Sequence, residues 1–559
     1  MIKCNLFISG HNEVSYRAKL LSYFRQRNRG WVLSLFAAVF IIYLPFLGSP
    51  FVFDDLSFLS SDAPRHYANS WFLLDLRWLP YASLGWTSAI FSDVVPHFFH
   101  VGNMLLHAAN VILLFFLLRL LVNSVIAGNE NSSAVTWGAW FGALIFACHP
   151  VAVYAVGYVI ERSILMATLF ALVMQLAYVR GLLVGQKRWL VLAVIAYFLA
   201  GFSKEHSVLM PAVLAGPTIL LRDKNKLDKR ALWLAWGAFV AIGVLLMLSA
   251  KGVIGTAYEA MATSLFERQR VVGSAAMLHL LSALTQSGLF FKYLLLWWLP
   301  NPAWMSVDMR EPFISSWSAW QGWLGVISYI AYGALGGWLL LRPRWMGLVG
   351  LALLYSWLQF LVEFSSIRVQ EPFVLYRSYL WLPGMMLFFP LLLAKLPGRR
   401  TLLGLGLLVL LLVPLAWNRL WVFADNYRLW NDAALLLRSD QEPGADRIFY
   451  NRGNAELVAQ NWEGAIADFQ RAVALSPQLA PVRYALGLAY FNSGRYQDAL
   501  AQFDAAIIIQ SDDAKFYYAK GMSLKRLHED DLAMRQIGKS CELKNMMACL
   551  IVQINSGRK

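Results

Sequence analysis

The sequence has little of what marks small secreted proteins or nucleic-acid-binding proteins. Four cysteines in 559 residues exclude a disulfide scaffold, and only Cys541 and Cys549 lie close together. The formal net charge is +15, but the basic residues lie in short loops between apolar runs. No single basic patch exists to bind nucleic acid. The first apolar run ends in Gly48-Ser49-Pro50, which is not a clear small-x-small site, so we expect no signal-peptide cleavage.

Apolar residues are abundant instead. They make up 58% of the chain, with a mean hydropathy of +0.52, against roughly 45–50% in soluble proteins. Many runs reach the roughly 20 residues that cross a bilayer. We expect about eleven spans, at 31–49, 98–121, 136–156, 163–182, 189–203, 207–221, 231–250, 317–341, 345–363, 378–394 and 401–419. The apolar stretch 276–299 carries His279, Gln286 and Lys292, and is predicted to lie in the membrane interface.

The charges of the loops predict one orientation. With residues 1–30 in the cytoplasm, the long loop 50–97 lies outside and contains only Arg65 and Arg77 as basic residues. An odd number of spans then places the C-terminal domain outside as well. The loops left in the cytoplasm are short and basic, as the positive-inside rule requires: Lys187-Arg188, Arg222 to Arg230, Arg342 to Arg344, and Lys395 with Arg399-Arg400.

The last part of the chain repeats with a period of 34 residues. Small and aromatic residues recur in register: Tyr450, Tyr484 and Tyr518; Gly453, Gly487 and Gly521; Ala465, Ala499 and Ala533; and Phe469 and Phe503 with Ile537. A 34-residue period with small residues at helix crossings is the signature of tetratricopeptide repeats (TPRs). We expect an all-α chain: a polytopic bundle over 31–420, a junction over 421–445 and a TPR α-solenoid of about three repeats over 446–559.

Ionisable residues interrupt the apolar pattern at four places that this orientation puts on the outer side. A charge near membrane depth is costly and usually functional. The places are Phe53-Asp54-Asp55; Cys148-His149-Pro150 with Glu161-Arg162; Ser203-Lys204-Glu205-His206; and Glu371, Tyr376, Arg377 and Tyr379 before Pro383.

Each place also has a structural interpretation. An acidic pair can begin a helix, Pro150 can end one, residues 203–206 can form a compact charged turn, and Arg377 can extend from an aromatic belt. Together, however, the four places put carboxylates and cations at one membrane surface. Adjacent Asp54 and Asp55 can raise one another's pKa and supply a general base. The cations can hold a lipid phosphate and stabilise it as a leaving group.

Several stretches resemble the transmembrane and tetratricopeptide repeat O-mannosyltransferases and their bacterial relatives in the GT-C glycosyltransferase superfamily. Phe51-Val52-Phe53-Asp54-Asp55 is similar to the family's first acidic motif, and Arg77-Trp78-Leu79-Pro80 to the element that follows. Asn103 and His107 match polar positions of the second span. The later signatures follow in order: "LIFACHPVAVYAVGYVIERS" with His149 and Arg162, "FSKEH" with Lys204 and Glu205 before Pro211, "YRSYLWLP", and "NRLWVFADNYRLWNDA" at the junction.

The resemblance implies transfer of a sugar from a polyprenyl-phosphate-linked donor, with inversion, to a hydroxyl of a protein or glycan. Asp54 is then the base, and Asp55 its neighbour and a ligand of the acceptor or of a divalent metal, if one is needed. The implied donor-phosphate contacts are Arg162, Lys204, Arg377, Arg77 and His149. The residues implied to orient groups or bind the acceptor are Glu205, His206, Glu371, Tyr376, Asn103 and His107. The TPR domain would dock the acceptor.

Two departures favour a bacterial member, in the inner membrane with a periplasmic TPR domain. Tyr154 stands where eukaryotic relatives carry a glutamate, and only about three TPRs are present. "KSCELKNMMACL" resembles the bridged cysteines of Sel1-like repeats, which implies a Cys541–Cys549 disulfide; two buried thiols are the alternative. The alternative function is a non-enzymatic, membrane-anchored TPR scaffold for envelope assembly, although a scaffold needs only one or two spans and no aligned charges.

Overall fold

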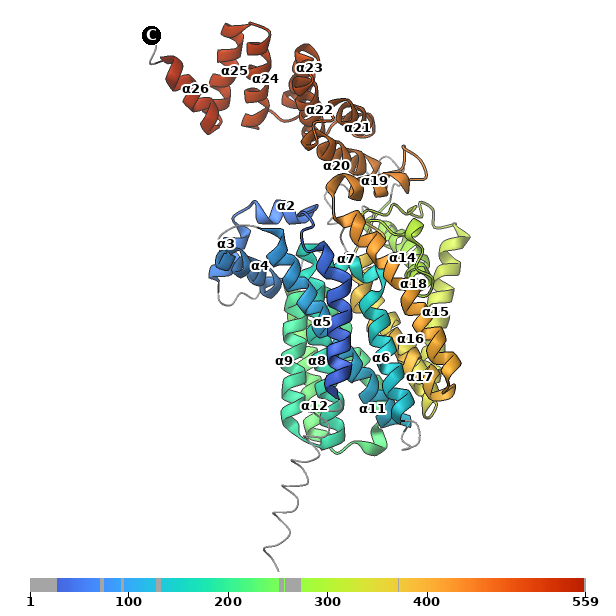
Figure 1. The fold of residues 1–559 in the computed structure, drawn as a ribbon. Coiled ribbons are helices and arrows are strands. Elements are labelled where there is room, and N and C mark those ends of the chain that lie inside the picture. Colours follow the sequence, from blue (N-terminus) through green and yellow to red (C-terminus); the bar gives the residue numbers. More distant parts are fainter. Residues whose placement is uncertain are drawn as a thin grey trace, which may run out of the picture.

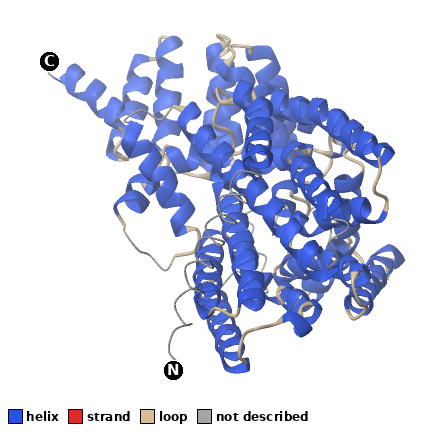
Figure 2. Cartoon of the chain, turned by 60° about the horizontal axis from the view of Figure 1, so that its bottom comes forward, coloured by secondary structure: helices blue, strands red, loops and turns tan. Residues whose placement is uncertain are grey.

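The computed structural model describes residues 28–70, 75–91, 95–126, 132–250, 256, 273–369 and 371–556. These residues form helices, and an isolated bridge between Met309 and Phe373 is the sole β-type pairing in the described ranges. The predicted all-α class is therefore confirmed (Figure 2). Figure 1 shows a bundle of long helices and, above it, an elongated array of shorter ones. Most of the predicted N-terminal segment 1–30 lies outside the described residues.

The bundle contains the long apolar helices. Within the described ranges, eight helices are long and apolar enough to cross a membrane, or nine if α6 and the bent segment after it count as one span. These helices are the first described one (Asn28–Phe46), α5 (Pro96–Ile126), α8 (Arg162–Val184), α12 (Lys229–Ser249), α14 (Ala275–Trp298), α15 (Trp320–Leu340), α16 (Trp345–Phe360) and α18 (Arg399–Phe423), with α6 (Ser132–Cys148) as the ninth. The shorter α9 (Lys187–Ser203) is not one of them.

Three of the predicted spans are not among these eight or nine. Segment 189–203 is the 17-residue α9. Segment 207–221 is broken into η5 (Glu205–Leu209), α10 (Met210–Val213) and α11 (Ala215–Leu220), and segment 378–394 into η9 (Leu375–Leu380), η10 (Leu382–Leu387) and α17 (Phe388–Lys395). Prolines favour both breaks, because proline lacks the N–H that would bond to the preceding turn: Pro211, Pro217, Pro383 and Pro390 each lie shortly after a break.

The prediction for 276–299 is also corrected. These residues form the continuous 24-residue helix α14, which is itself long and apolar enough to cross a membrane and is mostly buried within the bundle. Polar side chains of α14 contact backbone carbonyls of the same chain. Gln286 donates to the Pro372 carbonyl at 2.8 Å, and His279 lies 2.8 Å from the Phe364 carbonyl. The predicted span count and its odd parity therefore no longer fix the side of the C-terminal domain.

The two ends of the bundle differ in charge. Short basic loops meet at the end farther from the TPR array: Lys187 pairs with Asp228 at 3.0 Å, and Lys395 lies 4.4 Å from the ring of Trp345. At the other end lie α2 (Asp54–Leu59), α3 (Ala63–Asn69) and α4 (Trp78–Phe91), with the TPR array above them (Figure 1). The predicted outer loop and the TPR domain thus occupy the same end.

The C-terminal helices pair as the 34-residue period predicts. An added Cβ on Gly453 would lie 2.8 Å from the ring of Phe469, and one on Gly487 would lie 2.5 Å from the ring of Phe503. Glycine is therefore required where each repeat's two helices cross. The array consists of α20 (Ala445–Val458), α21 (Trp462–Leu475), α22 (Ala480–Asn492), α23 (Tyr496–Ile509), α24 (Ala514–Arg526), α25 (Asp530–Glu542) and α26 (Met546–Ser556).

A disulfide joins α25 to α26 in the structure. It links Cys541 and Cys549, whose Cα atoms are 4.6 Å apart, whereas Cys148 is a buried free thiol. At the other end of the array, α19 (Asn426–Leu435) connects the bundle to the repeats. Arg419 of α18 donates to Asp432 of α19 at 3.1 Å, so this junction is tied to the bundle by a partly buried ion pair.

Candidate functional site

Charged side chains at the TPR end of the bundle form one connected series of ion pairs, called here the ionic network. It begins at Arg77, whose guanidinium donates to both Glu205 oxygens at 2.5 and 3.0 Å. His206 follows, with its ring nitrogens 3.4 Å from Glu205 and 3.3 Å from Glu363. Burial raises the pKa of Glu205, but the charge of Arg77 outweighs this effect and holds that pKa well below its usual value. Glu205 is therefore an ionised partner and not the proton acceptor.

The network continues through Glu363, which is buried beneath two arginines. Arg377 donates to it at 3.0 Å, and Arg368 lies 3.6 Å away. Arg377 also lies 3.9 Å from Glu371. Of these four residues, Glu363 and both arginines are at most 4% exposed, so their charges are held by one another and not by water.

The last members of the network come from the junction with the TPR array. Arg447 of α20 donates to Glu371 at 2.6 Å and to Asp308 at 2.8 Å. Asp308 also accepts from Arg310 at 2.6 Å. The network therefore runs from the loop before α4 to the first TPR helix.

Lys204 holds a second ion pair beside the network. Its ammonium donates to Glu161 at 3.0 Å and to Ser163 at 3.3 Å, and it lies 5.3 Å from the ring of Tyr376. The structure thus places Lys204 beside Tyr376. Its pairing with Glu161 accounts for the charge of this buried lysine.

Asp54 lies beside these charges at the start of α2. Its backbone N–H donates to the Tyr158 hydroxyl at 3.0 Å. Partial burial raises the pKa of Asp54, hydrogen bonding with Tyr158 lowers it, the charges of Glu371 and Glu161 raise it, and Arg447 lowers it. The net rise brings the carboxylate closer to the pKa of an effective base near neutral pH. The residue is nevertheless exposed, so its carboxylate is accessible from solvent.

Asp55, by contrast, is buried and bonded to the backbone. It is 1% exposed, and its carboxylate accepts backbone N–H groups of Ile160 at 2.7 Å, Val52 at 3.2 Å and Val159 at 3.3 Å. Burial raises the pKa of Asp55, the three N–H bonds lower it and the charge of Asp54 raises it, for a net pKa of about 8. The predicted mutual effect of the two aspartates is thus secondary to burial. Asp55 fastens the Asp54 segment to the η4 helix (Val159–Glu161) and offers no oxygen to an acceptor or metal.

Arg162 does not join the network. Its guanidinium is 3% exposed and donates to Asn103 at 2.9 Å, to the Phe99 carbonyl at 2.8 Å, and to Ser83 and Thr87 at 3.2 Å. These protein acceptors account for the donors of the side chain, so the predicted phosphate contact is wrong in this geometry. The role of Arg162 is to join α4, α5 and α8. Asn103 joins α5 to Arg162 and to the carbonyls of Val156, Tyr158 and Val159 at 3.3 Å.

Two predicted histidines also lie away from the ionic network. His149 stacks on Trp297 with ring centroids 4.3 Å apart, and its Nδ1 accepts the N–H of Val151 at 3.3 Å. His107 lies inside the bundle, 2.7 Å from the Tyr379 hydroxyl and 3.1 Å from the Ala147 carbonyl. Both are held as packing and capping residues, which corrects their predicted contacts with donor or acceptor.

A cavity of about 460 Å³ opens beside the network. Its polar part is formed by Arg77, Glu205, His206 and Arg368, and its apolar walls come from α12, η5 and η8 (Leu361–Ser365). The apolar lining residues are Leu76, Val208, Leu209, Leu246, Met247, Ala250, Leu361 and Val362. Such a site suits an amphipathic molecule with an anionic group at one end and a hydrocarbon chain at the other.

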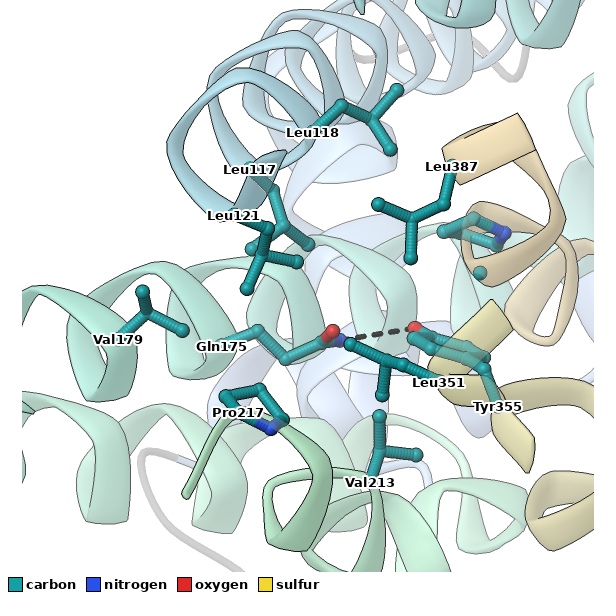
Figure 3. A pocket seen from close by; sticks show the side chains of 12 residues that line it. Leu117, Leu118, Leu121, Gln175, Val179, Val213, Pro217, Leu351, Tyr355 and Leu387 are labelled. Atoms are coloured by element: carbon teal, nitrogen blue, oxygen red, sulfur yellow. Dashed lines mark hydrogen bonds between the residues drawn. The ribbon is translucent and has the colours of Figure 1, made fainter. Parts of the chain in front are cut away.

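A second cavity, inside the bundle, is unsuited to a substrate. Figure 3 shows Gln175 and Tyr355 pointing toward one another among apolar side chains, with a 3.0 Å hydrogen bond between them. Its volume of about 10 Å³ leaves room for little more than one water molecule. Within the described ranges, no group of three or more His, Cys, Asp or Glu side chains is arranged to hold a metal ion.

Sequence reasoning missed several members of the network. Glu363 and Arg368 carried a usable signal, since buried charges at the end of an apolar run are costly and usually paired. Asp308 lies in a connecting segment, and Arg447 begins a TPR helix where an arginine is unremarkable. Neither position could be connected to Glu371 without the fold.

The comparisons with known proteins concern the C-terminal region. Family models described as "TPR repeat" and "Tetratricopeptide repeat" match residues 453–494 and 480–513. The C-terminal region contains TPR repeats. Over 102 residues the chain is 32% identical to "Superkiller protein 3" of Schizosaccharomyces pombe, an alignment that covers 18% of this chain and 7% of that protein.

Solved structures similar to this chain match a minor part of it. The "Arabidopsis OM64 TPR domain" is 20% identical, covers 21% of this chain and 95% of its own, and has a TM-score of 0.20. The "Crystal structure of MamA" is 23% identical, covers 27% of this chain and 81% of its own, and also has a TM-score of 0.20.

Proposed function

We propose that this chain is an integral-membrane glycosyltransferase of the GT-C type, which transfers a sugar from a polyprenyl-phosphate-linked donor to a hydroxyl of a protein or glycan. The observation that carries the proposal is the 460 Å³ cavity with apolar walls and a polar end, where Arg77 and Arg368 lie with Glu205 and His206, beside a network that leads to the exposed carboxylate of Asp54. A deletion strain tests it in cells: mass spectrometry of envelope glycoconjugates should find one sugar-containing product missing and restored by the wild-type gene. An unchanged set of glycoconjugates would refute it.

The donor fits the cavity by its chemistry. The apolar walls, which include Leu246, Met247 and Leu361, accommodate the isoprenoid chain. Arg77 and Arg368 lie at the end where the phosphate would be held. Arginine binds phosphate through paired, charge-assisted hydrogen bonds, which also stabilise the phosphate as it leaves.

In the proposed reaction, the acceptor oxygen attacks the anomeric carbon of the donor sugar. The bond from that carbon to the lipid-phosphate oxygen breaks, and its electron pair leaves with the phosphate. Asp54 takes the proton of the acceptor hydroxyl, which a positioned base does at a gain of roughly 100- to 10,000-fold in rate. Attack opposite the leaving group inverts the anomeric configuration.

The TPR repeats would present the acceptor. TPR arrays stack helix pairs into extended surfaces suited to binding other chains. The repeats also favour the alternative, a membrane-anchored scaffold without activity. A scaffold, however, has no use for the buried ion pairs of Glu363 and Lys204, which are costly to maintain without a partner or task.

We also propose that the bundle spans a bacterial inner membrane with the TPR domain in the periplasm. The basic loops gather at the end opposite the TPR array, as the positive-inside rule requires. Alkaline phosphatase fused after Lys559 is therefore expected to be active. An inactive phosphatase together with a fluorescent GFP fusion at the same position would contradict this orientation.

Changing Arg77 to methionine is expected to raise the KM for the lipid-linked donor about tenfold or more, with a smaller change in kcat, because a phosphate contact is lost. The measurement is initial rate against donor concentration in proteoliposomes. Arg77→Lys, which keeps the charge, should recover part of the affinity. Arg188→Met, an exposed change at the opposite end, is the matched control, and a KM for Arg77→Met equal to that control would exclude the contact.

A further inference from the structure

Arg447 belongs to the TPR array by sequence and to the transfer site by contact. It lies in the first turn of α20, the first helix of the array. Its guanidinium donates to Glu371 and Asp308 of the bundle at 2.6 and 2.8 Å and lies 5.1 Å from the ring of Phe53. Figure 1 shows α20 directly above the bundle. The side chain is 14% exposed, so these contacts lie in a closed joint and not on an open surface.

The contacted residues adjoin Asp54. Phe53 precedes it and has φ of 51°, a left-handed conformation that side-chain-bearing residues rarely adopt. The surroundings must hold this conformation in place. Trp430 of α19 packs on the Phe53 ring at 5.5 Å, and Arg447 covers it as well. The helices at the base of the array therefore fix the backbone that aims Asp54.

The groups that face Asp54 come from every element around it. They are Tyr158 and Glu161 beside η4, Glu371 before η9, Asp55 on α2 and Arg447 on α20. Two of these neighbours, Glu161 and Glu371, carry negative charge toward Asp54, and Arg447 is the cation that opposes them. Loss of Arg447 would leave Glu371 with one arginine fewer and Asp54 in a more negative environment.

We propose that Arg447 is a positioning residue of the transfer site, so that the first TPR helix is a structural part of the catalytic unit and not only a docking module. This inference rests on the proposed glycosyl transfer. Arg447 acts through Phe53 and Glu371, and it orients the Asp54 carboxylate without touching the reacting atoms.

The test compares Arg447→Met with Arg452→Met in the full-length protein. Arg452 lies on the same helix, but it donates to Asp468 inside the array, at 2.6 and 2.7 Å, and to Asn431 of α19 at 3.0 Å, whereas Arg447 donates to Glu371 and Asp308 of the bundle. The readout is kcat/KM against pH in proteoliposomes. A base is active when deprotonated, so activity falls as pH drops through its pKa. Removing the opposing cation raises that pKa, and the acid limb of Arg447→Met should move to higher pH by about one unit. Arg452→Met should keep the wild-type limb.

Arg447→Lys separates the effect of the positive charge from the effect of the two hydrogen bonds. It also provides a test if the methionine variant inserts poorly into the membrane. Lysine keeps the cation but cannot form both contacts as a planar fork. It should retain the wild-type acid limb while kcat falls about tenfold, because a misplaced base loses rate. A wild-type rate and acid limb in both Arg447 variants would overturn the inference while the wild-type activity upholds the proposed function. Absence of transfer by the wild-type protein would overturn both.

Discussion

Asparagine in place of Asp54 is expected to abolish sugar transfer, with a loss of about 100- to 10,000-fold in kcat. Asparagine has the size of aspartate but cannot accept the proton of the acceptor hydroxyl. The backbone N–H bond from residue 54 to Tyr158 does not involve the side chain and remains in the variant. Since Asp54 is exposed, the change should alter stability by no more than about 0.5 kcal/mol.

Asp62→Asn is the matched control for this change. Asp62 is also exposed, precedes α3 and makes no side-chain cap bond there. Rates are compared at equal protein levels in proteoliposomes. Because the pKa of Asp54 is raised, wild-type activity should fall on the acid side at a higher pH than an ordinary aspartate would give. Wild-type turnover in a well-folded Asp54→Asn protein would remove Asp54 from the mechanism.

Methionine in place of Arg162 is expected to destabilise the protein severely and not to weaken donor binding selectively. The change leaves the buried acceptors of Asn103, Phe99 and Ser83 without their donor, at about 1–3 kcal/mol for each unsatisfied group. We expect low membrane abundance and a lower unfolding temperature in detergent.

Arg180→Met is the control, because Arg180 lies on the same helix but is exposed, with its guanidinium over the ring of Trp189 at 4.4 Å. A cation–π contact at an exposed site contributes about 0.5–1 kcal/mol, so this variant should accumulate nearly normally. An Arg162→Met protein that is as stable as wild type, with only a raised donor KM, would restore the phosphate-binding role that the sequence predicts.

The parts of the fold that depend on local pattern were predictable. The TPR register follows from a repeated requirement for small residues, and Gly453 and Gly487 meet the phenylalanines of their own repeats. The number of long apolar helices was less predictable, because composition alone does not show where a proline breaks an apolar run. Pro211 and Pro383 divide two predicted spans into short helices.

The site was predictable in its residue types and not in its pairings. Loop charge placed Asp54, Lys204 and Arg377 at one end of the bundle, where the structure has them. Tertiary contacts decide which cations can reach a ligand and which are enclosed by other protein groups. Arg162 and Arg77 look alike in sequence, yet one is enclosed by protein acceptors and the other borders the cavity. Arg447 could not be found at all, since its partners lie more than 70 residues away.

The most direct test of the central claim is a transfer assay with purified protein in proteoliposomes. The protein is supplied with polyprenyl-phosphate-linked sugars and with hydroxyl-bearing peptide and glycan acceptors, and products are analysed by mass spectrometry and NMR. The account predicts a glycosylated acceptor of inverted anomeric configuration, formed only with the lipid-linked donor and absent with Asp54→Asn. Folded wild-type protein that transfers no sugar from these donors, while still restoring the deletion strain, would contradict the account and favour the scaffold.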